Sequence, residues 1–243
     1  MSTRGPGLAT LLGAILAPLA AWAGPPYVTD DPEPTDTGHW EIYNFVSGTG
    51  TPGNVVGEAG FDINYGGAPN LQLTAVLPAT FQNANQVGGG DIQLAVKYRF
   101  LQQQPGSWTP DVAFFPRVFV DTGTHYDPNR PGLFLPLWAE KDWGPWSLFG
   151  GGGIQLNPGT GERNFWQSGL AVSRSFGDRF SLGAEVYHQT PQAVGDKDFT
   201  GMGVGVTYRL SRHWSLISSG GPGLQNARQE GQYVFYTALY AQY

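Results

Sequence analysis

Gln232–Tyr243 reads QYVFYTALYAQY and alternates with a period of two up to the last residue of the sequence. One of its two faces is largely apolar and ends in aromatic rings: Tyr233, Phe235, Thr237, Leu239, Ala241 and Tyr243. Successive side chains of a β-strand point to opposite sides, so the pattern predicts a strand with one apolar and one mixed face. A terminal segment with this much apolar surface needs a partner, and we expect it to pair within a sheet.

The chain begins with a pattern typical of an export signal. Residues 1–23 contain one cation, Arg4, followed by a mostly apolar run that ends in the small-x-small sequence Ala21-Trp22-Ala23. Pro18 and the lack of cations after the run favour a cleaved signal peptide over a transmembrane helix. We predict a mature chain that starts near Gly24. Its formal charge is −7, because Arg4 is lost from a chain of charge −6.

Composition excludes several classes of protein. The sequence has no cysteine, which excludes disulfides, thiolate metal sites and a lipidated N-terminal cysteine. Its four histidines show no metal-ligand spacing, so we expect no metal and no other cofactor. Charge is too sparse and too acidic for a nucleic-acid-binding protein. The 36 glycines and 14% aromatic residues suit a bent, aromatic-rich sheet.

Short alternating runs fill the chain from residue 39 onward, after an extended, acidic and proline-rich segment at Gly24–Gly38 (GPPYVTDDPEPTDTG). They predict twelve strands, at 39–48, 55–66, 71–81, 89–101, 109–121, 132–142, 146–157, 164–176, 180–190, 199–210, 214–221 and 232–243. We expect the last strand to pair with the first and close a barrel, because a sheet in lipid cannot leave an edge unpaired.

The connections between these strands alternate in length. Four short ones lie at 66–70, 142–146, 176–180 and 210–214, with a slightly longer one at 102–108. The longer ones lie at 47–54, 81–90, 121–132, 157–163, 190–198 and 221–231. Short turns at one end and long loops at the other are typical of an outer-membrane barrel, with both termini on the periplasmic, short-turn side.

Aromatic residues gather beside the short turns, which favours a membrane barrel over a soluble one. They are Tyr65, Tyr98, Phe100, Trp143, Trp146, Phe176, Phe180, Tyr208, Trp214 and Tyr243. Rings of this kind collect at the headgroup level of a bilayer, because they join an apolar body to a polar edge. In a soluble barrel, by contrast, the apolar side of each strand would form a core.

The sequence also resembles a known group of proteins. The residues that carry the resemblance are Pro26–Tyr43 (PYVTDDPEPTDTGHWEIY) and Phe61–Pro78 (FDINYGGAPNLQLTAVLP), with shorter pieces at Leu182–Val186 and His213–Leu216. They resemble the outer-membrane family of transporters of the meta-cleavage phenol-degradation pathway. The resemblance implies an outer-membrane barrel that passes or binds small, often hydrophobic compounds. It supplies no catalytic residues.

If the apolar faces meet lipid, the other faces line a lumen. Its charged set is Glu58, Asp62, Asp91, Lys97, Arg99, Arg117, Glu140, Glu185 and Arg209, and its aromatic set is Phe115, Phe149, Tyr187, Tyr236 and Tyr240. The nearly balanced charges suggest ion pairs across the lumen and weak charge selectivity. Alternatively, these charges only pair with one another inside a narrow barrel and have no role in solute binding. The rings could offer a stacking path for aromatic solutes, or simply fill the lumen.

The Gly24–Gly38 segment is the obvious candidate for a plug. A twelve-stranded barrel lies between small filled barrels and wide aqueous porins, so a narrow or partly plugged passage is expected. Asp30, Asp31 and Glu33 could then reach Arg99 or Arg209 in the wall.

An enzymatic alternative rests on one pair of residues. The turn after residue 176 pairs two strands so that Ser168 falls about opposite His188, both facing outward toward lipid. A hydroxyl and an imidazole are what an acyl hydrolase needs, with a third group that holds the imidazole. We find no outward Asn or Asp beside His188, and we predict no catalytic residues.

The sequence therefore predicts an all-β, antiparallel transmembrane barrel of about twelve strands in the outer membrane of a Gram-negative cell. The predicted function is a passive channel for small solutes that include hydrophobic or aromatic compounds. The alternatives are a non-conducting structural or binding barrel and, less favoured, a lipid hydrolase. The expected partners are outer-membrane lipid, solutes, and the barrel-assembly machinery, which would recognise Tyr243.

Overall fold

The structure is a computed structural model that describes residues 26–83, 85–104, 106–120, 122 and 132–243. The predicted signal peptide at 1–23 and nearly all of the predicted loop at 121–132 lie outside the described residues. Among the residues described, no helix has both the length and the apolar character needed to cross a membrane.

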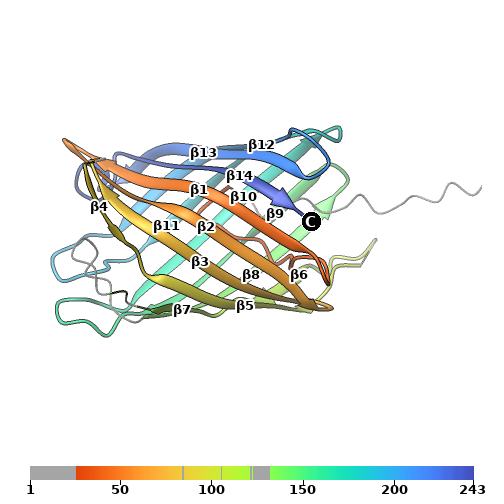
Figure 1. Ribbon diagram of the computed structural model, residues 1–243, viewed down its shortest axis with the longest axis horizontal. Helices are drawn as coiled ribbons and strands as arrows, with labels where there is room; N and C mark the ends of the chain where they lie inside the picture. The colour runs from red at the N-terminus through yellow and green to blue at the C-terminus, as the bar shows by residue number, and fades with distance from the viewer. Residues whose placement is uncertain (1–25, 84, 105, 121, 123–131) are drawn as a thin grey trace, which may run out of the picture.

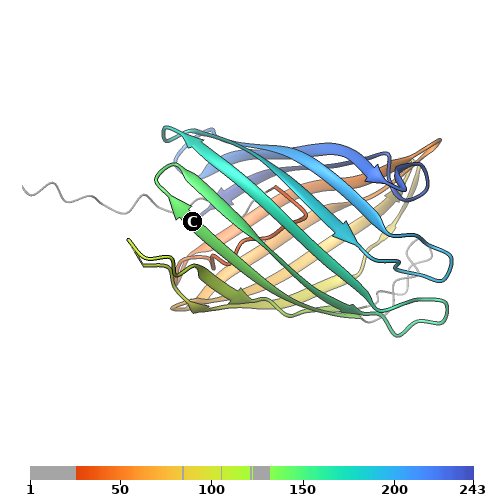
Figure 2. The same cartoon turned by 180° about the vertical axis from the view of Figure 1, so that it is seen from behind.

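One antiparallel sheet closes on itself to form a barrel (Figures 1 and 2). Its fourteen segments are β1 (Trp40–Thr51), β2 (Asn54–Ala68), β3 (Leu71–Gln82), β4 (Gln86–Gly89), β5 (Ile92–Leu101), β6 (Asp111–Phe114), β7 (Arg117–Val120), β8 (Gly132–Trp143), β9 (Trp146–Leu156), β10 (Phe165–Phe176), β11 (Phe180–Gln189), β12 (Phe199–Arg209), β13 (Trp214–Gln225) and β14 (Tyr233–Gln242). Both β4 and β5 pair with β3, and both β6 and β7 pair with β5 and β8. The fourteen segments therefore make twelve strands, which confirms the predicted fold class.

The barrel closes between its first and last strands, as predicted. The β1–β14 register runs from Glu41 opposite Gln242 to Gly50 opposite Tyr233. Beyond it, the Trp40 backbone N–H donates to the Tyr243 carbonyl at 2.8 Å, and the Tyr243 N–H donates to the Trp40 carbonyl at 3.0 Å. No edge of the sheet is left at this seam, and a closed sheet is what a lipid environment requires of β-structure.

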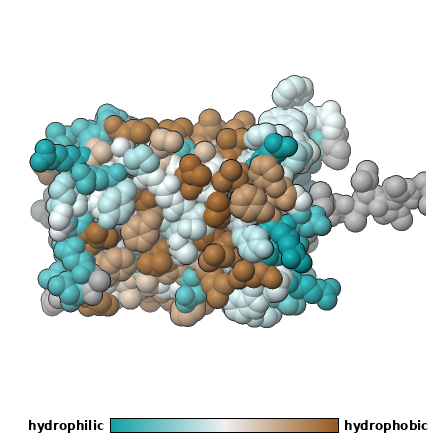
Figure 3. All heavy atoms as spheres, turned by 90° about the horizontal axis from the view of Figure 1, so that it is seen from above, coloured by the Kyte–Doolittle hydropathy of each residue, from teal (hydrophilic) through white to brown (hydrophobic). Residues whose placement is uncertain are grey.

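The outer face of the wall is apolar and the inner face is polar. On β5, Leu94, Val96 and Tyr98 are exposed, whereas Lys97 between them is buried. The aromatic residues predicted beside the short turns are also mostly exposed: Tyr98, Phe100, Trp143, Trp146, Phe176, Tyr208, Trp214 and Tyr243. Apolar side chains cover the middle of the wall and hydrophilic ones lie toward its two ends (Figure 3). A soluble barrel would reverse these faces.

Several strands extend further than the sequence predicted at the end of the barrel opposite the short turns, here called the long-loop end. The loop predicted at 47–54 is wrong: β1 and β2 are joined by a two-residue turn at Pro52–Gly53, where Gly53 has a φ of 78°. The loops predicted at 81–90 and 221–231 are likewise shortened by β3, β4 and β13, and a short helix, α1 (Ala227–Glu230), follows β13. Apolar alternation fades there although backbone pairing continues, so periodicity alone ended these strands too early.

The strand predicted at 109–121 is divided in two by Phe115 and Pro116. Proline has no N–H to donate to a ladder, and β6 ends before it while β7 begins after it. The flanking pairing survives, because the Val96 N–H donates to the Pro116 carbonyl at 3.2 Å and the Phe115 N–H donates to the Pro136 carbonyl at 3.1 Å. The wall therefore stays closed, and the Phe115 side chain is buried inside it.

Candidate functional site

Residues 26–38 lie inside the barrel and are not part of its wall (Figure 2). At one end of this lumen segment, the Ser219 hydroxyl donates to the Pro26 carbonyl, and the Tyr27 hydroxyl donates to the Gly205 carbonyl at 3.4 Å. At its other end, near the short turns, the Gly38 N–H donates to the Gly66 carbonyl at 2.8 Å. The segment thus runs from the middle of the lumen to the start of β1.

Glu185, on β11, holds the deepest part of the lumen segment. One carboxylate oxygen accepts the Val28 backbone N–H at 3.1 Å, and the other accepts the backbone N–H and the hydroxyl of Thr29 at 3.0 and 2.9 Å. Glu185 and Thr29 are both buried. Hydrogen bonds to an ionised acceptor are roughly twice as strong as neutral ones. Glu185 is therefore the strongest single anchor of the deep end of the segment, at Val28 and Thr29.

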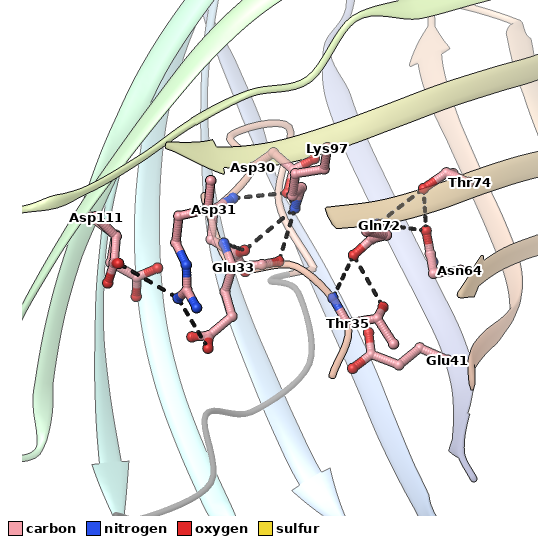
Figure 4. A network of polar contacts seen from close by, with 12 residues as sticks. Asp30, Asp31, Glu33, Thr35, Glu41, Asn64, Gln72, Thr74, Lys97 and Asp111 are labelled. Carbon is pink, nitrogen blue, oxygen red and sulfur yellow. Dashed lines mark hydrogen bonds and ion pairs between the residues drawn. The ribbon is translucent and has the colours of Figure 1, made fainter. Parts of the chain in front are cut away.

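Lys97, on β5, neutralises the acidic centre of the lumen segment. Its ammonium lies 3.1 Å from an Asp30 oxygen and 3.5 Å from an Asp31 oxygen (Figure 4). Its side chain is only 4% exposed, so water screens these pairs little. Burial raises the pKa of the Asp31 carboxyl to about 6, although the charge of Lys97 pulls it down. The segment and the wall therefore depend on each other for charge compensation.

Two arginines extend this network along the wall. The Arg99 guanidinium lies 3.4 Å from Glu33 and 3.5 Å from Asp111, and that of Arg117 lies 3.8 Å from Asp30. The pairing of the segment with Arg99 agrees with the sequence-based expectation. Lys97 and Arg117 were predicted to line the lumen, but their pairing with the segment was not predicted. Both of their cations lie over the Phe115 ring, at 4.7 and 4.8 Å from its centre.

A ladder of neutral polar side chains fixes the segment nearer the short turns. The amide oxygen of Gln72 accepts the N–H and the hydroxyl of Thr35 at 2.8 and 3.0 Å, and its amide nitrogen donates to Asn64 at 2.7 Å and to Thr74 at 2.9 Å (Figure 4). Gln72, Thr35, Asn64 and Thr74 are all buried. These four residues could not be predicted from the sequence, because uncharged amides and hydroxyls carry no distinctive spacing.

Inward glycines make room for the segment on three consecutive strands. A Cβ at Gly205 or Gly183 would collide with the Tyr27 side chain, and a Cβ at Gly169 would collide with the Thr29 hydroxyl. Glycine is favoured where another part of the chain approaches this closely. These inward-facing glycines on β10, β11 and β12 are visible in the sequence, but the sequence does not show which side chains occupy the space beside them.

The remaining lumen residues predicted from the sequence are buried or partly buried and share the inward parity of their strands. They are Glu58, Asp62, Asp91, Glu140, Tyr187, Arg209, Tyr236 and Tyr240, with Phe149 beside them. Glu140 accepts a hydrogen bond from the Ser147 hydroxyl, and Phe149 packs against Tyr27 with ring centres 5.9 Å apart. Their role in a solute path stays a prediction.

Two cavities adjoin the lumen segment. The larger, of about 500 Å³, lies toward the long-loop end and is lined by the segment, Glu58, Glu185, Tyr187 and Tyr236, among others. The smaller, of about 230 Å³, lies toward the short-turn end and includes Asp62, Lys97, Phe115 and Arg117. The segment lines both cavities, so it divides the free space of the lumen.

Replacing Glu185 with alanine is expected to loosen the segment without opening the wall. Three hydrogen bonds would be lost, and the backbone N–H groups of Val28 and Thr29 would lose their acceptor. Amide hydrogen exchange at these two residues should then rise by at least about tenfold, since each charge-assisted bond contributes about 1.5–3 kcal/mol. Glu140→Ala is the matched control, because Glu140 bonds the wall residue Ser147. Equal protection in Glu185→Ala and the parent protein would contradict this role.

Ser168 and His188 lie directly opposite each other in the β10–β11 register, as predicted. The Nδ1 atom of His188 lies 2.9 Å from the hydroxyl of Thr200, which donates to the amide oxygen of Gln225 at 2.7 Å. The imidazole thus has a positioning group, the Thr200 hydroxyl, whereas the sequence-based prediction considered only Asn or Asp for this place. Within the described part of the chain, however, no hydrogen bond joins Ser168 to His188.

A family model for a membrane-bound beta-barrel domain matches residues 58–240. Among solved structures, an outer membrane channel from Pseudomonas putida F1 aligns with a TM-score of 0.68 and 14% identity, over 88% of this chain and 98% of the channel. The NanC porin aligns with a TM-score of 0.57 and 9% identity, over 83% of this chain and 98% of the porin. No curated protein matches the chain. The shared fold is that of outer-membrane barrels.

Proposed function

This chain belongs to the family of membrane-bound beta-barrel domains designated DUF5777, and we propose that it is a passive outer-membrane channel for small solutes. The observation that carries the proposal is a wall that closes without residues 26–38, around a lumen that holds two cavities and this separate segment. In a filled structural barrel, side chains of the wall would occupy that space.

The lumen segment sets the width of the proposed channel. Hydrogen bonds and ion pairs hold it to the wall, and a polar network of this kind can rearrange more readily than a sheet. The expected solutes are small. Hydrophobic or aromatic compounds fit the rings of Tyr27, Tyr187 and Tyr236 along the larger cavity, and the resemblance to transporters of phenol degradation supports the same class.

Liposome swelling with graded solutes tests the proposal. Proteoliposomes that contain the purified barrel should swell in small neutral solutes. The rate of swelling should fall sharply as solute size increases, because the lumen segment narrows the path. A matched series of charged and aromatic solutes of similar mass would then rank selectivity. If no solute produces swelling above that of protein-free liposomes, the channel is rejected in favour of a non-conducting barrel.

The proposal assigns no catalysis to Ser168 and His188. The same preparation, assayed for phospholipid hydrolysis in detergent, should therefore show no activity that depends on the Ser168 hydroxyl. Hydrolysis by the parent protein that disappears in Ser168→Ala would contradict this part of the proposal and favour a lipid hydrolase.

A further inference from the structure

The connection between β5 and β6 is the longest one at the short-turn end, and it extends from the barrel near the C-terminus (Figures 1 and 2). The Gln103 amide nitrogen donates to the Asp142 carboxylate at 2.6 Å, and the Asp142 N–H donates to the Gln103 amide oxygen at 3.2 Å. These bonds hold the connection against the end of β8. Residues of both line a cavity of about 530 Å³, here called the turn cavity.

The turn cavity lies at the level where the apolar outer face of β8 ends. The residues of outward parity on this strand are Leu133, Leu135, Leu137, Ala139, Lys141 and Trp143. Leu137 is 51% exposed, and the two residues that follow Ala139 in this series, Lys141 and Trp143, line the turn cavity. Lysine and tryptophan side chains of this kind collect at the headgroup level of a bilayer. The turn cavity is therefore continuous with the lipid-facing surface.

Two indole rings form the apolar side of the turn cavity. Trp108 and Trp143 meet edge to face, with ring centres 6.4 Å apart. Trp108 is 87% exposed, more than any other large apolar side chain in the part of the chain that the structure describes. An indole is stabilised at a membrane interface, where its ring contacts lipid and its N–H stays near water. The face of the ring also attracts an ammonium group.

The turn cavity has one charged side chain of each sign. The Lys141 ammonium donates to the carbonyl oxygens of Thr109 and Gln104 at 3.1 and 3.5 Å, and no carboxylate of the described residues forms an ion pair with it. A lysine ammonium has three N–H groups, so a phosphate oxygen can accept the remaining one. Asp142 supplies the negative charge. Together the two charges match a zwitterionic headgroup.

We propose that the turn cavity binds a zwitterionic phospholipid, phosphatidylethanolamine, from the leaflet on the short-turn side of the barrel. The phosphate lies at Lys141, and the headgroup ammonium lies by the Trp108 ring and Asp142. The acyl chains follow the apolar outer face of β8. This site goes beyond the proposed channel function, and lipid binding there requires no conduction.

Native mass spectrometry of the folded, full-length barrel with added lipid tests the site. Phosphatidylethanolamine is the probe; with the same acyl chains, phosphatidylglycerol lacks the ammonium and diacylglycerol lacks the whole headgroup. The probe should bind more tightly than phosphatidylglycerol and at least about tenfold more tightly than diacylglycerol. Lys141→Gln should weaken its binding by at least about tenfold, because a charge-assisted contact is lost. Trp108→Ala should fold normally, since this side chain is largely exposed, and should weaken binding severalfold.

Arg174→Gln is the matched control. Arg174 is a second cation of outward parity near a short turn, on β10, where its guanidinium lies 5.1 Å from the Trp146 ring centre and 4.9 Å from that of Phe176. It does not line the turn cavity, so this variant should bind the probe as the parent protein does. Equal losses in Arg174→Gln and Lys141→Gln would replace the site with a diffuse cationic belt and overturn the proposal. Unchanged binding in Lys141→Gln or Trp108→Ala, or equal affinity for the probe and either comparison lipid, would overturn it as well.

Discussion

Deleting residues 26–36 is expected to raise single-channel conductance severalfold in planar bilayers. The deletion removes Asp30 and Asp31, which pair with Lys97, and the groups that bond Glu185 and Gln72, so the space they occupy joins the two cavities. It keeps Thr37–His39, where Thr37 bridges to Gly66 and the Gly38 N–H donates to the Gly66 carbonyl. The closing pair of β1 and β14 should therefore survive.

The matched control for this deletion is a double substitution that leaves the segment in the lumen. Asp30→Asn with Asp31→Asn keeps the length of the segment and removes its charge beside Lys97, so conductance should rise less than in the deletion variant. Retained resistance to denaturation by detergent would show that both barrels are folded. Unchanged conductance in the folded deletion variant would contradict the assignment of residues 26–38 as the element that narrows the lumen.

Deleting Tyr243 is expected to reduce the amount of folded barrel in the membrane severalfold, with little change in the conductance of the molecules that do assemble. Tyr243 supplies two backbone hydrogen bonds at the seam with Trp40, which together contribute about 1–3 kcal/mol. Its ring also stacks on His213 at 5.7 Å and meets the edge of Trp214 at 6.4 Å. We further propose that the barrel-assembly machinery recognises this terminal ring.

Tyr243→Phe separates these contributions, because it keeps the chain length, the seam hydrogen bonds and the ring. It should assemble as the parent protein does, whereas Tyr243→Ala should fall between the parent and the deletion variant. The folded fraction can be measured by heat-dependent mobility on gels of isolated outer membranes. Normal membrane levels of the deletion variant would contradict a role for Tyr243 in closing the seam.

Much of the wall could be predicted because its signals are local. A period of two fixes which residues of β5 face lipid, and turn residues beside it fix where the strand reverses. The closing pair also followed, since lipid forbids a free edge. Strand ends at the long-loop end could not be predicted this way. Pairing there runs beyond the apolar band, and Gly50 and Thr51 give no apolar alternation.

The site could be predicted only in outline. The inward parity of Lys97 and Glu185 is local, but their partners lie 67 and 156 residues away in sequence, at Asp30 and Thr29. Which wall charge meets which segment charge depends on the path of residues 26–38 across the lumen. That path in turn depends on the space left by the missing side chains of Gly169 and Gly205. The structure shows that Thr29 lies beside Gly169 and Tyr27 beside Gly205, which the sequence does not indicate.

The central claim is that residues 26–38 lie against the inner wall and narrow the channel. A cysteine pair, Thr29→Cys with Gly169→Cys, can lock them there, and the sequence has no other cysteine to compete. A Cβ built at Gly169 lies 3.1 Å from that of Thr29, slightly closer than the usual disulfide separation of about 3.5–4.5 Å. Thr29→Cys with Thr80→Cys is the control, since β3 and β10 are far apart around the barrel.

The decisive measurement is disulfide formation in the purified Thr29–Gly169 cysteine pair, together with its rate of liposome swelling. We predict that most molecules form the link, that the control pair does not, and that the locked barrel swells liposomes as slowly as the parent protein and far more slowly than the deletion variant. Free thiols at both positions in a folded barrel, or a locked barrel that swells liposomes as fast as the deletion variant, would contradict the account.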